Sequence, residues 1–487
     1  MNRQAFLRQW FPLSLILLLA GGLYLYQLGA ESLWSDEIIS ILDAEALPRI
    51  VKKERPLYYP ILRLWMFFGE SEVWLRGLSV LFGLASVSTI YLLGNKLFSK
   101  LTGSVAALLL ALSPLFIFHF QEVRMYGLSA LLSLGGTFAL ASALETPTTL
   151  STNLWTLGRV LMLYNTPLTA PLLLPDTLLI GWRFRQQPKV IFKFGIRLTF
   201  IVVSLLPLLY VLSRKPGERG PEQGLGNFPN FNEFLGSLVG YTVYLDKIPF
   251  PSNTIELFYK GFALLLLVLI AFALLKIRDL PKLYWVAMWG ILPIIIFFLA
   301  TPLSSKLWQP RHLMFALPYL LLLLAVGLVQ LWNSQKAIAV FASLIYSIAV
   351  IGGLTTYYTV QDRIDWRGVA EKIETEEQPG DEIAISADVF GRLFGYYYDG
   401  SAPINSVWKP GPPQPRPLPK SVIREAIEKL PPVSSRLWII YKHITDTGEK
   451  QHQLVQEVIE EEFQVEQKQN FEEIDLYLVT PKRDLER

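Results

Sequence analysis

The segment FPLSLILLLAGGLYLYQL (residues 11–28), followed closely by SLWSDEIISI (residues 32–41), indicates the class of protein. The first run holds no charged residue and is long enough to cross the hydrocarbon core of a bilayer. Basic residues precede it, as in a secretory signal, but the run is long for a signal peptide and more apolar runs follow. We therefore predict a retained first membrane helix, with Asp36 and Glu37 where the chain leaves the bilayer.

The composition supports a membrane protein throughout. Hydrophobic residues make up 52% of the 487 positions, and the mean hydropathy is +0.36. Because apolar runs of membrane length recur along the chain, we expect a polytopic α-helical membrane protein. The chain contains no cysteine, which excludes disulfides, a thiol nucleophile and a cysteine-ligated metal or cluster.

About eleven apolar segments are expected to span the membrane, of which a pair broken by prolines is the shortest. They cover residues 11–28, 74–97, 102–120, 126–144, 155–164, 168–182, 190–212, 256–275, 283–300, 313–332 and 337–357. With the amino terminus in the cytoplasm, the connections on that side are rich in Lys and Arg, as the positive-inside rule requires. The same order places SLWSDEIISI, HFQEVRMYG (residues 119–127) and SSKLWQPRH (residues 304–312) on the outer side.

The last part of the chain differs from the rest in composition, and we therefore predict two domains, residues 1–360 and 361–487. The tail contains 16 Lys and Arg against 24 Asp and Glu, a net charge of −8, whereas the preceding part carries +11. Periodicity predicts helices from Asp365 and Ser421, and strands from Asp381, Arg436 and Phe471, which together indicate a small extracytoplasmic α/β domain. The tail holds no glycine-rich phosphate-binding motif, and we expect no nucleic-acid partner.

Asp36 and Glu37 are the first candidate catalytic residues. Trp34, Ile38 and Ile41 recur around them at helical spacing, which is typical of an interfacial helix in the first outer loop. Adjacent helical positions point about 100° apart, so the two carboxylates cannot face one site equally. Two interpretations stay open: solvated charges that end a span, or a general base that accepts a proton from an acceptor hydroxyl. Mg²⁺ or Mn²⁺ held by the pair is a further alternative.

The segment QEVRMYG supplies the second group of candidate residues, Glu122, Arg124 and Tyr126. An arginine this near the membrane is costly unless it snorkels, pairs with an acid or binds an anion. We therefore expect either an ion pair between helices, substrate contact, or both.

Two more outer segments carry cations and aromatic side chains. RPLYYPILRLW contains Arg55, which could reach a phosphate, with Tyr58 and Tyr59, which suit an aromatic belt or a sugar-stacking surface. SSKLWQPRH contains cations at the start of a span, where they would either snorkel or stabilise a lipid-linked phosphate as it leaves. These last candidates are Lys306, Arg311 and His312. No HExxH or DxD pattern indicates a metal site.

In their order and shared side, these motifs resemble the GT-C membrane glycosyltransferases of glycosyltransferase family 39, which include protein O-mannosyltransferases and the aminoarabinose transferase of lipid A. The resemblance runs through "LWSDE", "RPLYYPILRLW", "QEVRMYGLSALLSL", "RHLMFALPYLLLLLAVGL" and "DWRGVAEKI". It implies an inverting transfer of a sugar from a polyprenyl-phosphate donor on the outer face. It matches Asp36 to the catalytic base, with Glu37 beside it, and Glu122 and Arg124 to an acidic motif that shapes the site.

The expected function is therefore transfer of that sugar to a hydroxyl or phosphate of a lipid, glycan or protein acceptor. The protein would act in the plasma (inner) membrane, with its site and tail on the extracytoplasmic side. A transporter or flippase is the main alternative, and it predicts ionisable residues in the middle of spans. A polymerase or ligase of lipid-linked glycans is chemically similar and stays open.

Overall fold

The computed structural model describes residues 3–46, 56–213, 227–230, 233–234, 237, 239–240, 252–275, 281–304, 307–360, 363–385, 388–406, 420–428, 436–443 and 448–482. The chain divides into two compact units. The helical unit contains Met1–Leu28 and Asp43–Gln361, and the C-terminal unit contains Asp362–Arg487 together with Gly29–Leu42. A short piece of the first loop thus belongs with the tail, although nothing in its own sequence indicates this.

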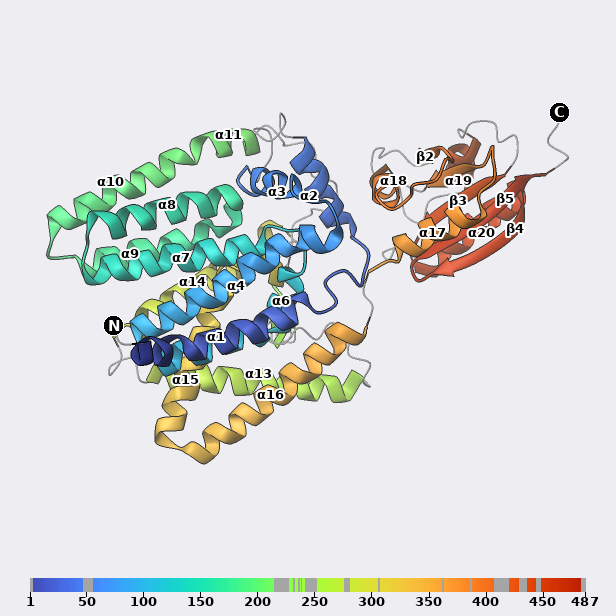
Figure 1. The fold of residues 1–487 in the computed structure, drawn as a ribbon. Helices are drawn as coiled ribbons and strands as arrows, with labels where there is room; N and C mark the ends of the chain where they lie inside the picture. Colours follow the sequence, from blue (N-terminus) through green and yellow to red (C-terminus); the bar gives the residue numbers. More distant parts are fainter. Residues whose placement is uncertain are drawn as a thin grey trace. The chain divides into compact units, whose positions relative to one another are not determined.

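Each apolar segment expected from the sequence is helical (Figure 1). The expected polytopic α-helical class is therefore confirmed. The helices of this part are α1 (Arg3–Leu25), α2 (Ser35–Glu45), α3 (Tyr58–Met66), α4 (Glu72–Leu97), α5 (Lys100–Leu112), α6 (Pro114–Phe120), α7 (Tyr126–Glu145), α8 (Thr149–Asn165), η2 (Pro167–Leu172), α9 (Leu173–Arg183), α10 (Pro188–Ser204), α11 (Leu206–Ser213), α13 (Ser252–Leu275), α14 (Leu283–Ala300), η4 (Thr301–Leu303), η5 (Pro310–Leu313), α15 (Leu317–Ser334) and α16 (Lys336–Thr359).

The lengths and apolarity of these helices make the chain an integral membrane protein. Within the described residues, six helices are long and apolar enough to cross a membrane. The pair α5 and α6, bent by 65° where Pro114 begins α6, would make a seventh span, and Trp10–Leu25 and Gly261–Leu275 are shorter apolar helices. The proline-broken segments after residue 150 form α8, the 3₁₀ turn η2 and α9, because proline cannot donate a backbone hydrogen bond.

One end of the helical unit, where α1 and α16 end and α7 begins, is called the exit face here. Gln121, which follows α6 directly, links the end of α1 to α16. Its amide donates to the carbonyl oxygens of Tyr24 at 2.8 Å and Tyr26 at 2.9 Å, and its side-chain oxygen accepts from the Tyr357 hydroxyl. The end of α8 joins them, since Asn165 donates to the carbonyl oxygen of Met125 at 3.1 Å.

Cations gather at the opposite end, where α4, α7 and α9 end and α14 begins. Lys96 and Lys282 both pair with Glu145, the former at 2.8 Å, and Arg183 Nε donates to the Leu144 carbonyl at 3.1 Å. Because α14 begins here and runs to the other end, the α6–α7 junction and the α14–α15 connection both lie at the exit face. HFQEVRMYG and SSKLWQPRH thus share one end of the helical unit, as the order of spans predicts for them.

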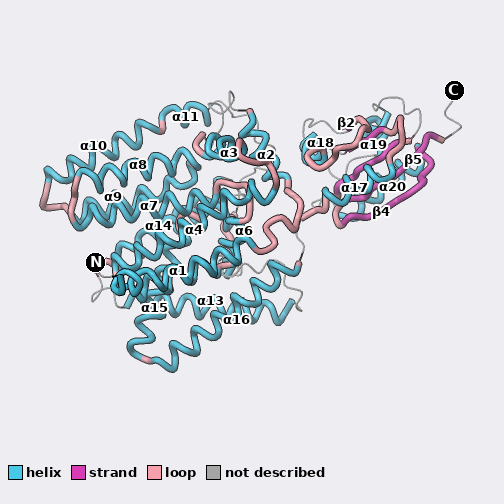
Figure 2. The backbone as a smooth tube through the Cα atoms, in the orientation of Figure 1, coloured by secondary structure: helices cyan, strands magenta, loops and turns pink. Residues whose placement is uncertain are grey.

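The C-terminal unit is an α/β domain, and the described strands all belong to it (Figure 2). Its five-stranded sheet has the order β2-β1-β3-β5-β4, in which β1 is parallel to β2 and β3, and β5 is antiparallel to β3 and β4. The elements are α17 (Trp366–Glu376), β1 (Glu382–Ile385), α18 (Asp388–Phe394), β2 (Ile404–Ser406), α19 (Lys420–Glu428), β3 (Leu437–Lys442), α20 (Gly448–Glu462), β4 (Phe463–Phe471) and β5 (Ile474–Pro481). The expected small C-terminal α/β region is present.

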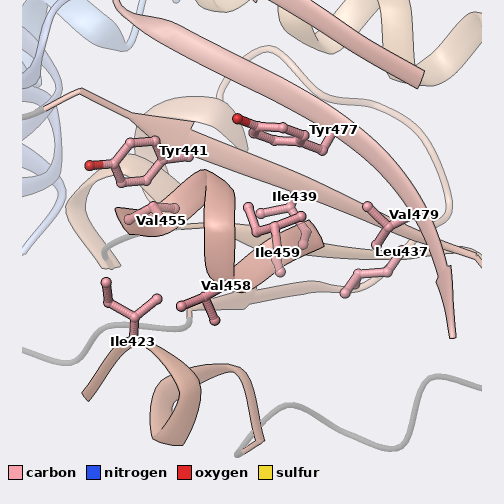
Figure 3. Close-up of a cluster of buried hydrophobic side chains, with 10 residues drawn as sticks. Ile423, Leu437, Ile439, Tyr441, Val455, Val458, Ile459, Tyr477 and Val479 are labelled. Carbon is pink, nitrogen blue, oxygen red and sulfur yellow. The ribbon is translucent and has the colours of Figure 1, made fainter. Parts of the chain in front are cut away.

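The core of this domain lies between the sheet and α20 (Figure 3). Leu437, Ile439 and Tyr441 alternate along β3 and so share one face of the sheet. Val455 and Ile459, one helical turn apart on α20, pack against that face. The last predicted strand begins later than expected, because Glu472 adopts φ 53° in the turn between β4 and β5.

Candidate functional site

The junction between α6 and α7 contains a buried acid, Glu122. Its side chain is fully buried, and its Oε2 lies 2.9 Å from Nδ1 of His119, one helical turn earlier. Ser79 of α4 donates its hydroxyl to the Glu122 carbonyl oxygen, which fixes the backbone here. Among the described residues, Glu122 Oε1 has no hydrogen-bond partner. A buried carboxylate oxygen without a donor is costly, so this atom is suited to accept from a bound ligand or an ordered water.

Arg124 and Tyr126 complete this cluster, called the junction cluster here and made of His119, Glu122, Arg124 and Tyr126. Arg124 is buried, and its guanidinium carbon lies 5.8 Å from the centre of the Tyr126 ring. The centre of that ring lies 4.9 Å from the centre of the His119 ring. The cluster thus places a cation, an acid and an imidazole together at the exit face. A guanidinium matches the geometry of a phosphate, and a carboxylate oxygen accepts from hydroxyl groups.

Glu37 lies in the C-terminal unit and is fully buried there. Its Oε2 accepts a hydrogen bond from Arg363 Nη1 at 2.9 Å and from the backbone amide of Trp34 at 3.3 Å. Arg363 also approaches Glu31, with Nε 3.6 Å from Oε2. Glu37 therefore fastens the start of α2 to the first residues of the tail.

Two more hydrogen bonds dock this first-loop segment onto tail residues. The backbone amide of Leu33 donates to the hydroxyl of Tyr397 at 2.5 Å, and the Ser32 hydroxyl accepts from the backbone amide of Arg367 at 3.2 Å. Asp36 is the half-buried neighbour of the buried Glu37, and its carbonyl oxygen accepts from Ser40 one turn later. Of the two acids, Asp36 is the one that is only partly buried.

The remaining candidates lie at or near the exit face, apart from two outside the described residues. Tyr58 and Tyr59 begin α3 and are buried, with ring centres 5.9 Å apart. In η5, Arg311 Nε donates to Gln309 at 2.8 Å, and His312 Nδ1 lies 3.1 Å from the Leu307 carbonyl oxygen. Arg55 and Lys306 fall outside the described residues.

Sequence reasoning missed a second buried acid, Asp176 of α9, which pairs with Arg159 of α8. Arg159 Nε lies 2.7 Å from Asp176 Oδ2, and Trp155 and Trp289 donate to the same carboxylate at 2.8 and 3.0 Å. Arg159 Nη2 also donates to Thr137 at 2.7 Å. This group, called the buried node, saturates both carboxylate oxygens and joins four helices.

Asp36 and Glu37 do not fit as joint ligands of one Mg²⁺ or Mn²⁺ ion. Such ions need several oxygen ligands around one point. The Oε2 atom of Glu37 is already engaged by Arg363, whose positive charge repels a cation.

By sequence, no family model and no curated protein matches this chain. Solved structures do match its fold. ArnT from Cupriavidus metallidurans is similar with a TM-score of 0.59 in the apo state and 0.54 bound to undecaprenyl phosphate, at 12% identity over 96% of this chain and 97% of that one. Archaeal oligosaccharyltransferase AglB from Archaeoglobus fulgidus, in complex with an inhibitory peptide and a dolichol-phosphate, is similar with a TM-score of 0.53 at 11% identity, over 89% of this chain and 70% of that one. The chain thus has the GT-C fold of membrane glycosyltransferases, as the resemblance predicts.

Proposed function

We propose that this protein is an inverting glycosyltransferase that moves a sugar from a polyprenyl-phosphate-linked donor to a hydroxyl or phosphate of a lipid, glycan or protein acceptor. The observation that carries the proposal is the junction cluster. It holds, in one cluster, a buried carboxylate oxygen without a described partner and the guanidinium of Arg124, at the exit face of a GT-C fold. Binding of undecaprenyl phosphate by ArnT and of a dolichol-phosphate by AglB supports a lipid-phosphate donor.

The chemistry needs a base and cations but no covalent intermediate. The acceptor oxygen attacks the anomeric carbon, the bond from that carbon to the phosphate oxygen breaks, and the phosphate leaves with the electron pair. Asp36 takes the proton of the acceptor hydroxyl, because it is the acid of the pair that is only partly buried while Glu37 positions α2.

The other candidate residues serve the donor. Arg124 contacts the donor phosphate and stabilises the charge that it gains on leaving. Glu122, oriented by His119, accepts from a sugar hydroxyl. We assign the basic residues Arg55, Lys306, Arg311 and His312 to the phosphate as well, and Tyr58, Tyr59 and Tyr126 to contacts with the substrate. The reaction takes place on the extracytoplasmic side of the plasma (inner) membrane.

The test is transfer of label from radiolabelled polyprenyl-phosphate sugars to components of a membrane extract by the purified full-length protein. Asp36→Asn should reduce transfer by about 10²- to 10⁴-fold, the usual contribution of a general base. Asp43→Asn, on the same helix, is the matched control and should keep its rate. Transfer from nucleotide sugars alone, or a fully active Asp36→Asn variant, would refute the proposal.

A transporter or flippase is the second hypothesis, because the buried node is an ionisable pair inside the helical unit. Its hydrogen bonds favour a structural role instead, since Asp176 accepts from Arg159, Trp155 and Trp289. Movement of a fluorescent polyprenyl phosphate across proteoliposomes without sugar transfer would favour the transporter. A polymerase or ligase of lipid-linked glycans would instead be recognised by a labelled glycan product.

A further inference from the structure

The C-terminal unit brings together two imidazoles and a carboxylate that have no role in the proposed reaction. Nε2 of His443 lies 3.3 Å from Oδ2 of Asp475, and Nδ1 of His452 lies 3.1 Å from the same oxygen. The three ligand atoms all lie within 4.8 Å of one another. Among the described residues, no other group of three His, Asp or Glu side chains is arranged in this way.

The two nitrogen–oxygen separations are close to the edge length of a zinc coordination tetrahedron. Zinc bonds to histidine nitrogen and carboxylate oxygen are about 2.0–2.1 Å long, which places neighbouring tetrahedral ligands roughly 3.3–3.4 Å apart. We propose that His443, His452 and Asp475 bind a divalent transition-metal ion, and that Zn²⁺ is the ion that fits this ligand set best. Two histidines and one carboxylate leave a fourth position for water.

The surroundings orient the ligands for this role. Asn470 Nδ2 donates to Asp475 Oδ1 at 2.9 Å, which turns the other oxygen, Oδ2, toward the two rings. Outer hydrogen bonds of this kind commonly fix metal-binding carboxylates. The backbone amide of His443 is held by the Glu473 carbonyl oxygen at 2.7 Å. Asp475 is 2% exposed, whereas the His443 and His452 side chains are 29% and 25% exposed, so the site opens to solvent on the imidazole side.

The ion would join three elements that come together only in the folded domain. His443 follows β3 directly, His452 lies in the second turn of α20, and Asp475 lies in β5. In the register of the sheet Asp475 pairs with Tyr441, two residues before His443. Because ligands from separate elements are assembled only on folding, the binding free energy of a metal adds to the stability of the domain.

Other polar groups face Asp475 Oδ2 and define the alternative without metal. The Tyr477 hydroxyl donates to this oxygen at 3.2 Å, and Lys468 Nζ lies 3.9 Å from it. In that alternative the imidazoles only form ion pairs with the carboxylate. Residues 361–487 carry a net charge of −8, which favours the binding of a metal cation to this domain.

The experiment uses the full-length protein in detergent, stripped with a chelator and then given Zn²⁺ alone. We expect one tightly bound zinc per chain by elemental analysis, a higher thermal midpoint, and visible absorption of tetrahedral type when Co²⁺ replaces Zn²⁺. His452→Ala and Asp475→Asn should lose all three signals, and Asn470→Ala should weaken Zn²⁺ affinity by roughly 10- to 100-fold. Gln453→Ala, next to His452 on α20 and exposed, is the control that keeps them.

If His452→Ala fails to fold, His443→Gln provides the same test at a half-exposed position. Zinc content no higher in the wild type than in these variants, or octahedral Co²⁺ absorption, would overturn the proposal. Asp36→Asn should leave zinc content unchanged, so the metal site and the proposed function fail separately.

Discussion

Among the described residues of the helical unit, two carboxylates are fully buried, and they differ in how many hydrogen bonds they accept. Both Asp176 and Glu122 have fully buried side chains. Asp176 accepts from two indoles and twice from Arg159, which leaves neither oxygen open. Glu122 has His119 at one oxygen, and its other oxygen has no hydrogen-bond partner among the described residues.

This difference separates a structural group from a binding group. A buried ion pair with every hydrogen bond satisfied holds its helices in one arrangement, and removal of one partner leaves an uncompensated charge. A buried acid with one open oxygen bears a free-energy cost that a ligand can relieve. We therefore interpret the buried node as the support of the helical unit and the junction cluster as its ligand-binding part.

The largest expected effect follows removal of the cation of the buried node. Arg159→Ala leaves Asp176 as a buried, uncompensated charge, which should cost about 3–5 kcal/mol of stability. Thermal unfolding in detergent measures this loss, with Arg185→Ala, an exposed arginine in the turn after α9, as control. An unchanged midpoint for Arg159→Ala would show that the node does not support the fold.

A smaller loss is expected at Gly136, where α7 and α8 cross. A Cβ there would lie 2.8 Å from Arg159 Nη1, and a Cβ on Gly158 would lie 2.8 Å from the Gly136 Cα atom. Gly136→Ala should therefore displace Arg159 and destabilise the protein by about 1–3 kcal/mol. Gly135→Ala is the matched control, because its Cβ meets nothing within 4 Å. Equal midpoints for the two variants would contradict the close packing.

Much of this arrangement can be predicted from sequence where the signal is local. Apolar runs of membrane length predicted the helices, and His119 and Glu122 stand one helical turn apart, so their contact could have been inferred. The strand β4 was missed because FQVEQKQNF is polar and mostly exposed at a sheet edge, where little apolar burial marks a strand.

Contacts between segments far apart in the chain could not be predicted from local sequence patterns. Arg159 and Asp176 lie on different short helices, before and after η2, and no sequence pattern in either helix predicts their ion pair. The hydrogen bond from Leu33 to Tyr397 joins residues 364 positions apart, and that from Arg363 to Glu37 joins residues 326 apart. Pairing over such separations depends on the whole fold, so the place of Glu37 could not be read from SLWSDEIISI.

In the junction cluster, the substitution Arg124→Lys tests the proposed contact between Arg124 and the donor phosphate. Arg124→Lys keeps the charge but loses the planar fork that fits a phosphate. We expect the KM for the polyprenyl-phosphate donor to rise roughly tenfold, equal to about 1.4 kcal/mol, with the thermal midpoint unchanged. Steady-state kinetics over a range of donor concentrations measure this change. A KM equal to that of the wild type would remove Arg124 from the donor site.

The smallest effect concerns Glu377, an acid of the C-terminal unit outside the membrane helices. Burial raises its pKa, but hydrogen bonds from Tyr398 and Ser401 outweigh burial, so the pKa lies below the ordinary value of 4.5. A lowered pKa means that these contacts stabilise the folded state above pH 4.5 and that the stabilisation is lost as the pH falls through the folded-state pKa. Glu377→Gln should therefore flatten the acid limb of the stability curve slightly. Superimposable curves for variant and wild type would contradict this.

The most direct test of the difference between Glu122 and Asp176 uses the variant Glu122→Gln. Its rate of sugar transfer is measured per folded molecule, together with its thermal midpoint. Loss of a hydrogen bond to a charged group costs about 1.5–3 kcal/mol, so transfer should fall roughly 10- to 150-fold. The midpoint should stay near that of the wild type, unlike that of Arg159→Ala. A wild-type transfer rate, or a midpoint as low as that of Arg159→Ala, would show that Glu122 does not bind the substrate.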